Sequence, residues 1–346
     1  MPRLGVAVVG AGYWGPNLLR NFQQSPDFRL HWLCDVQEDR ARAVLGSYST
    51  VRTTASLADV LADDEVDCVA VATPARSHHD VAMAALEAGK HVLVEKPLAG
   101  TFDEGQALVD AAAARGLVLM CDHTFCYTPA VAKIRELVHG GVLGDLHYFD
   151  SVRINLGLIQ TDVNVVCDLA PHDVSIMDYL IAQEPVSVAA QAAGHGGSPT
   201  ENIAYLTVRY SGSLLGAVHV NWLAPAKVRR TIVGGSKRMM IYDDMEPSEK
   251  LKVYDKGVSI SSDPSDEYQF MISYRSGDMH APRLDTREAL AVEADNIVAA
   301  MDGREPLVSD GRAGARVVRI LEAAQRSIEQ GGALIALNGA VPAAAG

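Results

Sequence analysis

The sequence predicts an α/β protein in which a parallel sheet with helices on both faces precedes an α+β domain with a large, mainly antiparallel open sheet. Strand and helix patterns alternate over about the first 120 residues, which is typical of parallel sheets. Glycines at positions 10, 12 and 15 lie between the first strand and the first helix. In the second half, strands follow one another without helices between them, as in antiparallel sheets.

The alternating region is expected to be one domain, residues 1–122. Its strands are predicted at Leu4–Val9, Leu30–Cys34, Thr50–Val51, Val66–Ala72, His91–Val94 and Leu117–Cys121. Its helices are predicted at Pro16–Phe22, Glu38–Leu45, Ser56–Ala62, His78–Ala88 and Phe102–Arg115. Ligands of such folds bind beyond the carboxyl ends of the strands, where Asp35, Thr73 and Lys96 lie.

Residues 123–346 are expected to form the second domain. Helices are predicted at Pro129–His139, Asp168–Ile181, Arg287–Met301 and Gly311–Glu329. Strands are predicted at Asp145–Asn155, Val186–Ala193, Ile203–Tyr210, Leu214–Trp222, Val228–Gly234, Arg238–Tyr242 and Leu251–Tyr254. A sheet with one face uncovered by helices favours pairing with another copy. We therefore expect a homodimer or homotetramer formed through this sheet.

The glycine motif predicts a dinucleotide site. Gly10 permits the tight turn, Gly12 lets the backbone approach a pyrophosphate, and Gly15 allows close packing of helix on strand. The phosphates would face the free N–H groups at the helix N-terminus. Asp35 follows the second strand, about 20 residues on, where a ribose-binding acid belongs. Its carboxylate favours NAD and disfavours the 2′-phosphate of NADP. The alternative is a glycine turn in another α/β fold, with Asp35 only capping a helix.

Composition excludes several classes of partner. The 346-residue chain has a formal charge of −13, so no basic field indicates nucleic acid or an anionic membrane. It lacks an apolar run of about 18 residues, so we expect no membrane span. The N-terminus leads directly into a strand and the five cysteines form no CxxC motif, which together predict a cytoplasmic protein without a zinc site.

Lys96 is the first candidate catalytic group. It lies between Glu95 and Pro97 at a strand end, and proline favours an extended conformation in the residue before it. This geometry would direct the lysine towards the nicotinamide. Pro97 can be cis or trans, and the alternative role for Lys96 is that of a solvated surface residue.

Asp168 and His172 are the second candidate. Since proline is tolerated in a first helical turn, Pro171 places the helix start near Asp168. Residues four apart share one helix face. A histidine near a helix N-terminus is favoured in its neutral form, which can accept a proton from an alcohol. Alternatively, Asp168 is only an N-cap and His172 a core histidine.

Three motifs together, Gly10-Ala11-Gly12-Tyr13-Trp14-Gly15, Glu95-Lys96-Pro97 and Asp168-xxx-His172, resemble those of the Gfo/Idh/MocA oxidoreductases through nearly the whole chain. The resemblance implies an NAD(P)-binding Rossmann domain and a second domain that binds substrate and forms oligomer contacts. It implies catalytic roles for Lys96 and His172, with Asp168 orienting the histidine. The expected cofactor contacts are Gly10, Gly12, Tyr13, Trp14, Gly15, Asp35, Thr73, Pro74, His78, Glu95, Lys96 and Pro97.

Finer features are similar to the branch of that family acting on nucleotide sugars. They comprise Tyr13-Trp14-Gly15-Pro16-Asn17-Leu18-Leu19-Arg20-Asn21-Phe22, His123-Thr124-Phe125 with Pro129-Ala130, and Asp168-Leu169-Ala170-Pro171-His172-Asp173. Members of that branch oxidise the 3-hydroxyl of UDP-N-acetylglucosamine-type or glucuronate-type sugars, or reduce 3-keto sugars. Asp122, Cys126 and Cys167 depart from the pattern, because glycine, a larger apolar residue and tryptophan are expected there.

The candidate substrate contacts are polar and basic: His123, Tyr127, Arg153, Asn155, Asn164, Lys227 and Arg229. Lys227 and Arg229 share one face of a strand and could meet a diphosphate. Alternatively, they face solvent or a partner subunit.

The hypothesis is an NAD-dependent sugar dehydrogenase acting on a secondary alcohol of a sugar, with a nucleotide sugar as the expected substrate. An inositol or free-sugar dehydrogenase, or a 3-ketosugar reductase, is the enzymatic alternative. A non-catalytic NAD or sugar sensor is the alternative of another class.

Overall fold

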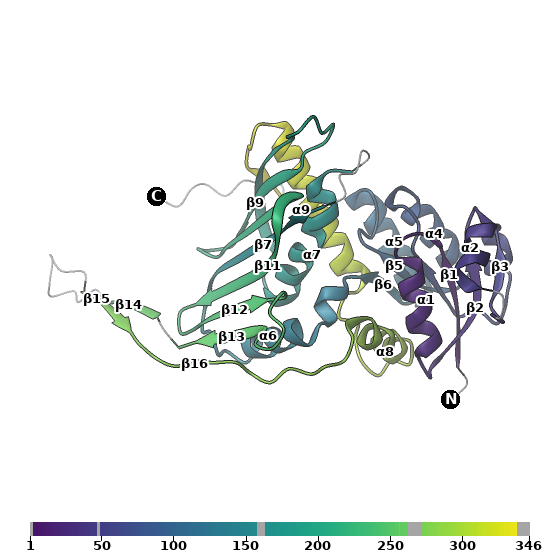
Figure 1. Ribbon diagram of the computed structural model, residues 1–346, viewed down its shortest axis with the longest axis horizontal. Helices are drawn as coiled ribbons and strands as arrows, with labels where there is room; N and C mark the ends of the chain where they lie inside the picture. The colour runs from purple at the N-terminus through teal and green to yellow at the C-terminus, as the bar shows by residue number, and fades with distance from the viewer. Residues whose placement is uncertain (1–2, 47–48, 158–162, 256, 262–270, 338–346) are drawn as a thin grey trace. The chain divides into compact units, whose positions relative to one another are not determined.

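The computed structural model describes residues 3–46, 49–157, 163–255, 257–261 and 271–337 (Figure 1). The chain divides into two compact units, residues 1–128 with 287–322 and residues 129–286 with 323–346. This division differs from the expected boundary after residue 122. Helix α8 (Ala289–Met301) packs against α1 (Gly15–Gln24) and against the short 3₁₀ helix Thr124–Tyr127. It therefore belongs to the first unit despite its late position in the chain.

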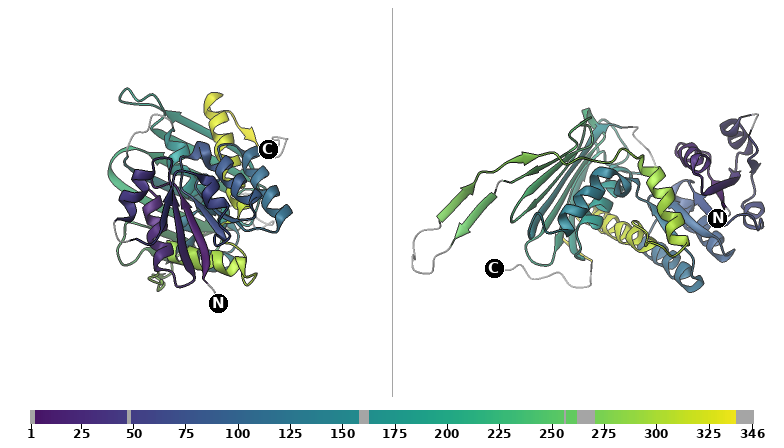
Figure 2. Two further views of the ribbon diagram at one scale, coloured as in Figure 1. Left: turned by 90° about the vertical axis from the view of Figure 1, so that its right-hand side faces the viewer. Right: turned by 90° about the horizontal axis from the view of Figure 1, so that it is seen from below.

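The first unit contains a six-stranded sheet in the order β3-β2-β1-β4-β5-β6, with every pair parallel. This strand order is that of the Rossmann fold, which confirms the predicted architecture. Figure 2 (left) shows helices beside this twisted sheet. Its strands are β1 (Leu4–Val9), β2 (Phe28–Cys34), β3 (Arg52–Thr54), β4 (Cys68–Val71), β5 (His91–Glu95) and β6 (Leu119–Asp122).

The helices of the first unit follow the predicted alternation. Besides α1 and α8 they are α2 (Glu38–Leu45), α3 (Leu57–Leu61), α4 (His78–Glu87) and α5 (Phe102–Arg115). Helix α5 shows why its bounds are readable from sequence. Thr101 and Glu104 form a reciprocal capping box at its start, and Gly116 ends it with a φ of 66°.

The second unit is built on a nine-stranded sheet in the order β16-β13-β12-β11-β7-β10-β9-β8-β17. Its strands are β7 (Leu146–Leu156), β8 (Pro185–Ala193), β9 (Ile203–Tyr210), β10 (Leu215–Asn221), β11 (Leu223–Gly235), β12 (Met239–Asp243), β13 (Leu251–Tyr254), β16 (Met279–His280) and β17 (Ile335–Ala336). All neighbours are antiparallel except β7 and β10, which are parallel. The prediction of a large, mainly antiparallel sheet is therefore confirmed.

Helices α6 (Pro129–His139) and α7 (Val165–Leu180) lie on one face of this sheet, and α9 (Gly311–Glu329) passes from the first unit into the second. Along β9 burial alternates strictly, because every second side chain points at the helical layer. The opposite side chains, such as Tyr205, are exposed. Strands β14 (Gly257–Ser261) and β15 (Met271–Arg275) form a separate pair that extends from β13 and β16 (Figure 2, right).

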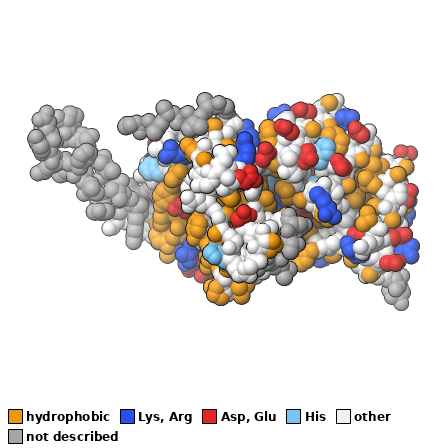
Figure 3. All heavy atoms as spheres, turned by 90° about the horizontal axis from the view of Figure 1, so that it is seen from above, with side chains coloured by type: hydrophobic (Ala, Val, Ile, Leu, Met, Phe, Trp, Pro, Cys, Tyr) orange, Lys and Arg blue, Asp and Glu red, His pale blue; other side chains and the backbone are white. Residues whose placement is uncertain are grey.

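On the face drawn in Figure 3, acidic and basic side chains are interspersed and do not gather into one basic field. None of the described helices is long and apolar enough to cross a membrane.

Candidate active site

The three glycines of the loop between β1 and α1 differ in the space around them. Gly10 has a φ of 109°, and a Cβ there would lie 2.4 Å from the Ala72 carbonyl oxygen. A Cβ on Gly15 would lie 2.1 Å from the carbonyl oxygen of Gly10. By contrast, a Cβ on Gly12 would have no atom of the described residues within 4 Å, apart from those of its two neighbours in the chain. The packing of the described residues therefore does not require glycine at position 12, which fits a position left open for the pyrophosphate of a dinucleotide.

Asp35 is held rigidly beside this loop. It is 6% exposed, its Oδ2 accepts the Ala11 N–H at 2.8 Å, and its Oδ1 accepts the Gln37 N–H at 2.8 Å. Arg40 Nη1 lies 3.6 Å from Oδ2. Tyr13 of the loop is 92% exposed. The carboxylate is thus preorganised at the end of β2, where it fits the hydroxyls of an adenosine ribose.

His78 has a different role from the predicted cofactor contact. Its ring is 1% exposed, with Nδ1 2.7 Å from the Pro97 carbonyl oxygen and Nε2 2.8 Å from that of Thr73. Burial lowers its pKa and the charge of Lys96 adds to this effect, whereas the two carbonyls oppose it. Both ring nitrogens are therefore committed to backbone, and His78 ties together the loops after β4 and β5. Thr73 is half-buried and Pro74 exposed at the first of these loops.

Lys96 is half-buried at the end of β5, and its peptide bond to Pro97 is cis. The charge of Lys96 contributes to the lowered pKa values of His78 and His123 and opposes the raised pKa of Glu95. The lysine therefore acts electrostatically on the group of side chains at the carboxyl ends of β5 and β6.

Asp122, which stands where glycine was expected, lies at the centre of that group. The register of β5 and β6 pairs it with Glu95. Its Oδ2 accepts the Trp14 indole N–H at 3.1 Å, and its Oδ1 accepts the Thr124 hydroxyl at 2.5 Å. Asp122 thereby connects the glycine loop to the carboxyl end of β6, beside the end of β5 that precedes Lys96. Sequence reasoning missed this role, although an acid ending an apolar strand was a visible signal.

Of the two polar residues expected to contact substrate after β6, one is corrected. Tyr127 is 3% exposed, and its hydroxyl lies 3.2 Å from Asn296 Oδ1 and 3.0 Å from Ser309 Oγ. Tyr127 is thus a core residue that ties the turn after β6 to α8. His123 is 2% exposed, and neither ring nitrogen has a hydrogen-bond partner among the described residues. Burial lowers its pKa to about 4, so its ring is neutral at pH 7.

In the second unit, α7 begins at Val165, one turn earlier than predicted. Asn164 caps it by accepting the Cys167 N–H at 3.0 Å, and its amide also donates to Glu201 and Gln325. Asn164 is therefore a capping residue, which corrects its expected role in substrate binding. Pro171 lies inside the helix, in its second turn, where it leaves one backbone carbonyl without its helical N–H donor.

Asp168 and His172 remain one turn apart on α7, both half-buried. Asp168 is not the N-cap, and its Oδ2 accepts the Trp222 indole N–H at 3.1 Å. Because His172 lies two turns into the helix, the expected influence of the helix dipole does not apply to it. The pair keeps its shared helix face, and the carboxylate is oriented by the end of β10.

Arg153 is also corrected from substrate contact to structural ion pair. Its Nε lies 2.6 Å from Asp173 Oδ2, and Ser151 donates to the same carboxylate at 2.5 Å. The pair ties β7 to α7 directly after His172.

The remaining predicted substrate contacts lie on β7 and β11. Arg229 Nη1 forms an ion pair with Asp244 Oδ2 at 3.2 Å, so its charge already has a partner next to the end of β12. Lys227 is exposed on β11 and Asn155 is half-buried on β7.

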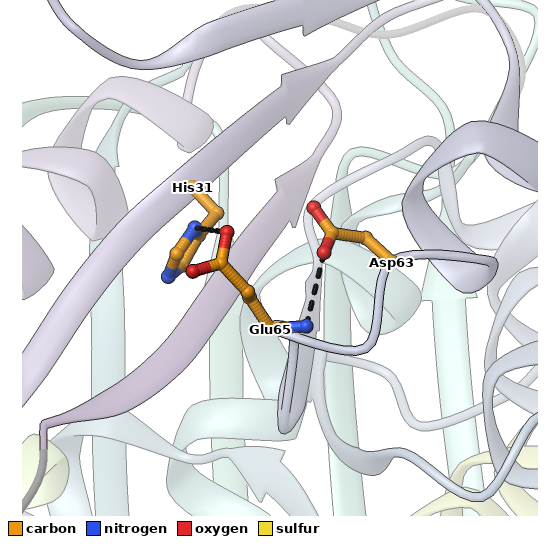
Figure 4. Close-up of side chains that lie close together, drawn as sticks. All are labelled: His31, Asp63 and Glu65. Carbon is orange, nitrogen blue, oxygen red and sulfur yellow. Dashed lines mark hydrogen bonds and ion pairs between the residues drawn. The ribbon is translucent and has the colours of Figure 1, made fainter.

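One group among the described residues has the spacing of metal ligands, and it does not lie at the carboxyl ends of the strands, where the cofactor site is expected. His31, Asp63 and Glu65 approach one another beside β2 (Figure 4). Asp63 already accepts the Trp32 indole N–H, the Glu65 N–H and the Arg52 guanidinium. The cation of Arg52 thus takes the place that a metal would need, and the group is an ion-pair cluster.

Comparison with known proteins agrees with this geometry. Residues 4–123 match the model of the oxidoreductase family with an NAD-binding Rossmann fold, and residues 131–241 match the GFO/IDH/MocA C-terminal domain. The chain is 26% identical over 322 residues to UDP-N-acetylglucosamine 3-dehydrogenase of Acidithiobacillus ferrooxidans, covering 92% of this chain and 95% of that protein. It is 22% identical to myo-inositol 2-dehydrogenase of Thermotoga maritima, covering 94% and 96%.

Other relatives match over a shorter length. An uncharacterized oxidoreductase of Streptococcus pneumoniae is 34% identical over 146 residues, 42% of this chain and 39% of its own. The chain spans about half or less of the length of the first such relatives. Among solved structures, GenD2 from gentamicin A biosynthesis, in complex with NAD, superposes with a TM-score of 0.81 at 25% identity, covering 98% and 97% of the two chains.

The two domain matches together cover more than half of the chain, in the order and with the topology that the structure shows. The protein belongs to the GFO/IDH/MocA oxidoreductase family, and its first unit is an NAD-binding Rossmann domain.

Proposed function

We propose that the protein is an NAD-dependent dehydrogenase that oxidises a secondary alcohol of a sugar, with the 3-hydroxyl of a nucleotide sugar as the substrate position. The proposal rests on two features, one in each unit: Lys96 lies at the carboxyl end of β5, and Asp168 and His172 lie one turn apart on α7. NAD held by the Gly10–Gly15 loop and Asp35 supplies the hydride acceptor.

The protein groups have separate tasks in this proposal. His172 takes the proton of the hydroxyl that is oxidised, as a general base. Asp168, itself held by the Trp222 indole, keeps the imidazole in position. Lys96 donates a hydrogen bond to the same oxygen and stabilises the negative charge that develops on it. Thr73, Pro74 and Pro97 shape the loops beside the nicotinamide. His78 holds these two loops together through its contacts with the carbonyl oxygens of Thr73 and Pro97.

Substrate class is the part that needs a direct test. Similarity to a nucleotide-sugar dehydrogenase and to an inositol dehydrogenase extends over nearly the whole chain in both cases. Lys227 and Asn155 stay candidate contacts for substrate, and an exposed lysine suits a diphosphate.

The experiment is NADH formation measured by absorbance with three sets of substrates: nucleotide sugars, the corresponding free sugars, and inositols. Activity that requires the diphosphonucleoside group supports the proposal. Activity with inositols or free sugars alone replaces the substrate class and keeps the reaction. Tight NAD binding without hydride transfer to any of the three sets, or from NADH to 3-keto sugars, favours a sensor and overturns the proposal.

A further inference from the structure

Three carboxyl groups meet in the interior of the first unit, close to Lys96. Glu95 ends β5, Asp122 ends β6, and Glu293 comes from α8. They are 9%, 1% and 2% exposed, respectively. The carboxyl group of Asp122 lies within hydrogen-bonding reach of both glutamates. Three adjacent carboxylates could not all be ionised in such a dry site, because like charges at this separation repel strongly.

Hydrogen-bond donors are unevenly distributed among the three carboxyl groups. Asp122 accepts hydrogen bonds from Trp14 and Thr124, and Glu95 Oε2 accepts the Lys96 N–H at 3.2 Å. Among the described residues, Glu95 Oε1 and both carboxyl oxygens of Glu293 receive no donor. An ionised carboxylate buried without donors is costly, whereas a protonated one donates a hydrogen bond of its own. Protons on the two glutamates therefore supply the missing donors.

Two neighbouring features point to further polar partners here. His123 follows Asp122 directly, and both of its buried ring nitrogens lack a partner within the described part of the chain. A cavity of about 10 Å³, lined by Glu293 and Asn21 among apolar side chains, has room for about one water molecule. The cluster and its surroundings thus offer more polar groups than the folded chain itself satisfies, as expected beside a ligand.

We propose that Glu95 and Glu293 carry protons that they share with Asp122, and that Asp122 is thereby a positioning residue, which joins the glycine loop to the strand end that carries Lys96. Trp14 reaches Asp122 from the cofactor loop, and Glu95 holds the backbone of Lys96. A change at Asp122 is therefore transmitted to both the NAD site and the lysine. The effect on Lys96 rests on the proposed function, whereas the sharing of protons and the effect on NAD binding do not.

The charges facing the cluster agree with this assignment. Burial first, and then Asp122, raise the pKa of Glu95 and of Glu293 well above the usual value, and only Lys96 opposes this for Glu95. The other titratable neighbours are uncharged at neutral pH. They are Cys121, whose pKa burial and the same carboxyls raise, Tyr127, whose pKa burial and Glu293 raise, and His123, whose pKa burial lowers.

The first experiment needs no substrate. Infrared spectra of the folded protein at pH 7 should contain the carbonyl band of protonated carboxylic acid, and Glu95→Gln and Glu293→Gln should each remove part of it. Glu87→Gln, at an exposed position on α4, is the matched control and should leave the band intact. If neither cluster variant changes the band, the proton-sharing cluster is refuted.

Folding stability gives a second readout with a defined sign. Since the folded glutamates keep protons that the unfolded chain releases above about pH 4.3, raising the pH favours unfolding, by up to about tenfold in the equilibrium constant per pH unit and proton. Glu293→Gln should therefore flatten the fall in stability between pH 5 and 8. An unchanged slope would contradict the assignment of a proton to Glu293.

The positioning role is tested by NAD affinity, measured by calorimetry. Asp122→Asn should weaken NAD binding about tenfold or more, because a neutral amide oxygen accepts the Trp14 indole N–H more weakly than a carboxylate does. Glu293→Gln, which still donates to Asp122, should retain more affinity than Glu293→Leu, which cannot. Wild-type affinity in Asp122→Asn overturns the positioning role. If wild-type protein oxidises no sugar, the proposed function fails while these measurements still decide the cluster.

Discussion

Arg153 and Asp173 form a buried ion pair that joins β7 to α7, with Arg153 Nε 2.6 Å from Asp173 Oδ2 and side chains 4% and 2% exposed. Asp173 directly follows His172, so the pair holds the helical turn that carries the candidate base.

We predict that Arg153→Leu destabilises the protein by about 3–5 kcal/mol in urea unfolding, because Asp173 is left as an uncompensated buried charge. Arg230→Leu is the control, since the pair of Arg230 with Asp243 is exposed and should contribute about 0–1 kcal/mol. An Arg153→Leu protein of normal stability with a weakened sugar KM would restore the substrate role that the structure argues against.

His172→Ala and Lys96→Met should each lower kcat by about a hundred- to ten-thousand-fold, the usual range for a lost general base or a lost stabilising donor. NAD affinity should change little in His172→Ala, because the histidine is not among the residues assigned to the cofactor. Stopped-flow NADH formation with calorimetric NAD binding separates the two effects. Turnover at the wild-type rate in either variant would remove that residue from the mechanism.

Asp35→Ser should shift the cofactor preference from NAD towards NADP. The ionised carboxylate repels a 2′-phosphate, and its removal leaves the Arg40 guanidinium, now 3.6 Å from Asp35 Oδ2, available to that phosphate. The ratio of kcat/KM values for the two cofactors should move by about tenfold to a hundredfold, the equivalent of one charged hydrogen bond. Adding Arg40→Ala should cancel the gain for NADP. No change in the ratio would place the ribose elsewhere.

His123 gives a pH dependence of its own. Burial lowers its pKa to about 4 in the folded state, whereas the unfolded value is near 6.5. Between these values the unfolded chain binds the extra proton, so stability falls as the pH falls, by about 3 kcal/mol in all. His123→Phe should remove this loss in urea unfolding measured from pH 7 to 4. The sign is opposite to that of the Glu95/Glu293 cluster, so single variants separate the two contributions.

The uncovered face of the large sheet should pair with a second copy. Tyr205 and Leu215 are 55% and 41% exposed there, and the Tyr205 ring stacks on that of His219 with centroids 4.2 Å apart. We predict that Tyr205→Glu with Leu215→Glu lowers the mass measured by light scattering to that of a monomer. Val44→Glu, at an exposed apolar position on α2, is the control. A monomeric wild type would contradict the expected dimer or tetramer.

Local signals were enough for much of the structure. The glycine loop, the acid after β2 and the strand–helix alternation each depend on residues close together in the chain, and the bounds of α2, α5, β9, β13 and α9 match the predicted ones. Pro171 misled the prediction of the start of α7, because the Asn164 cap sets that start and the proline lies in the second turn despite its local cost. The parallel pairing of β7 with β10 and the packing of α8 in the first unit depend on distant segments, which periodicity does not report.

Residue type likewise predicted chemistry better than role. Arg153, Tyr127, Asn164 and His78 are polar residues near the expected site. Each is bonded to a group that only the folded chain brings near: Asp173, Ser309, Gln325 and the carbonyl of Pro97, respectively. The pattern of glycines, apolar runs and strand-end polar groups established an NAD-binding α/β enzyme fold, since those features act over a few residues. Which polar side chains remain for ligands, and which carboxyls share protons, was decided by tertiary packing, because a buried polar group is stabilised only by partners that the fold brings within reach.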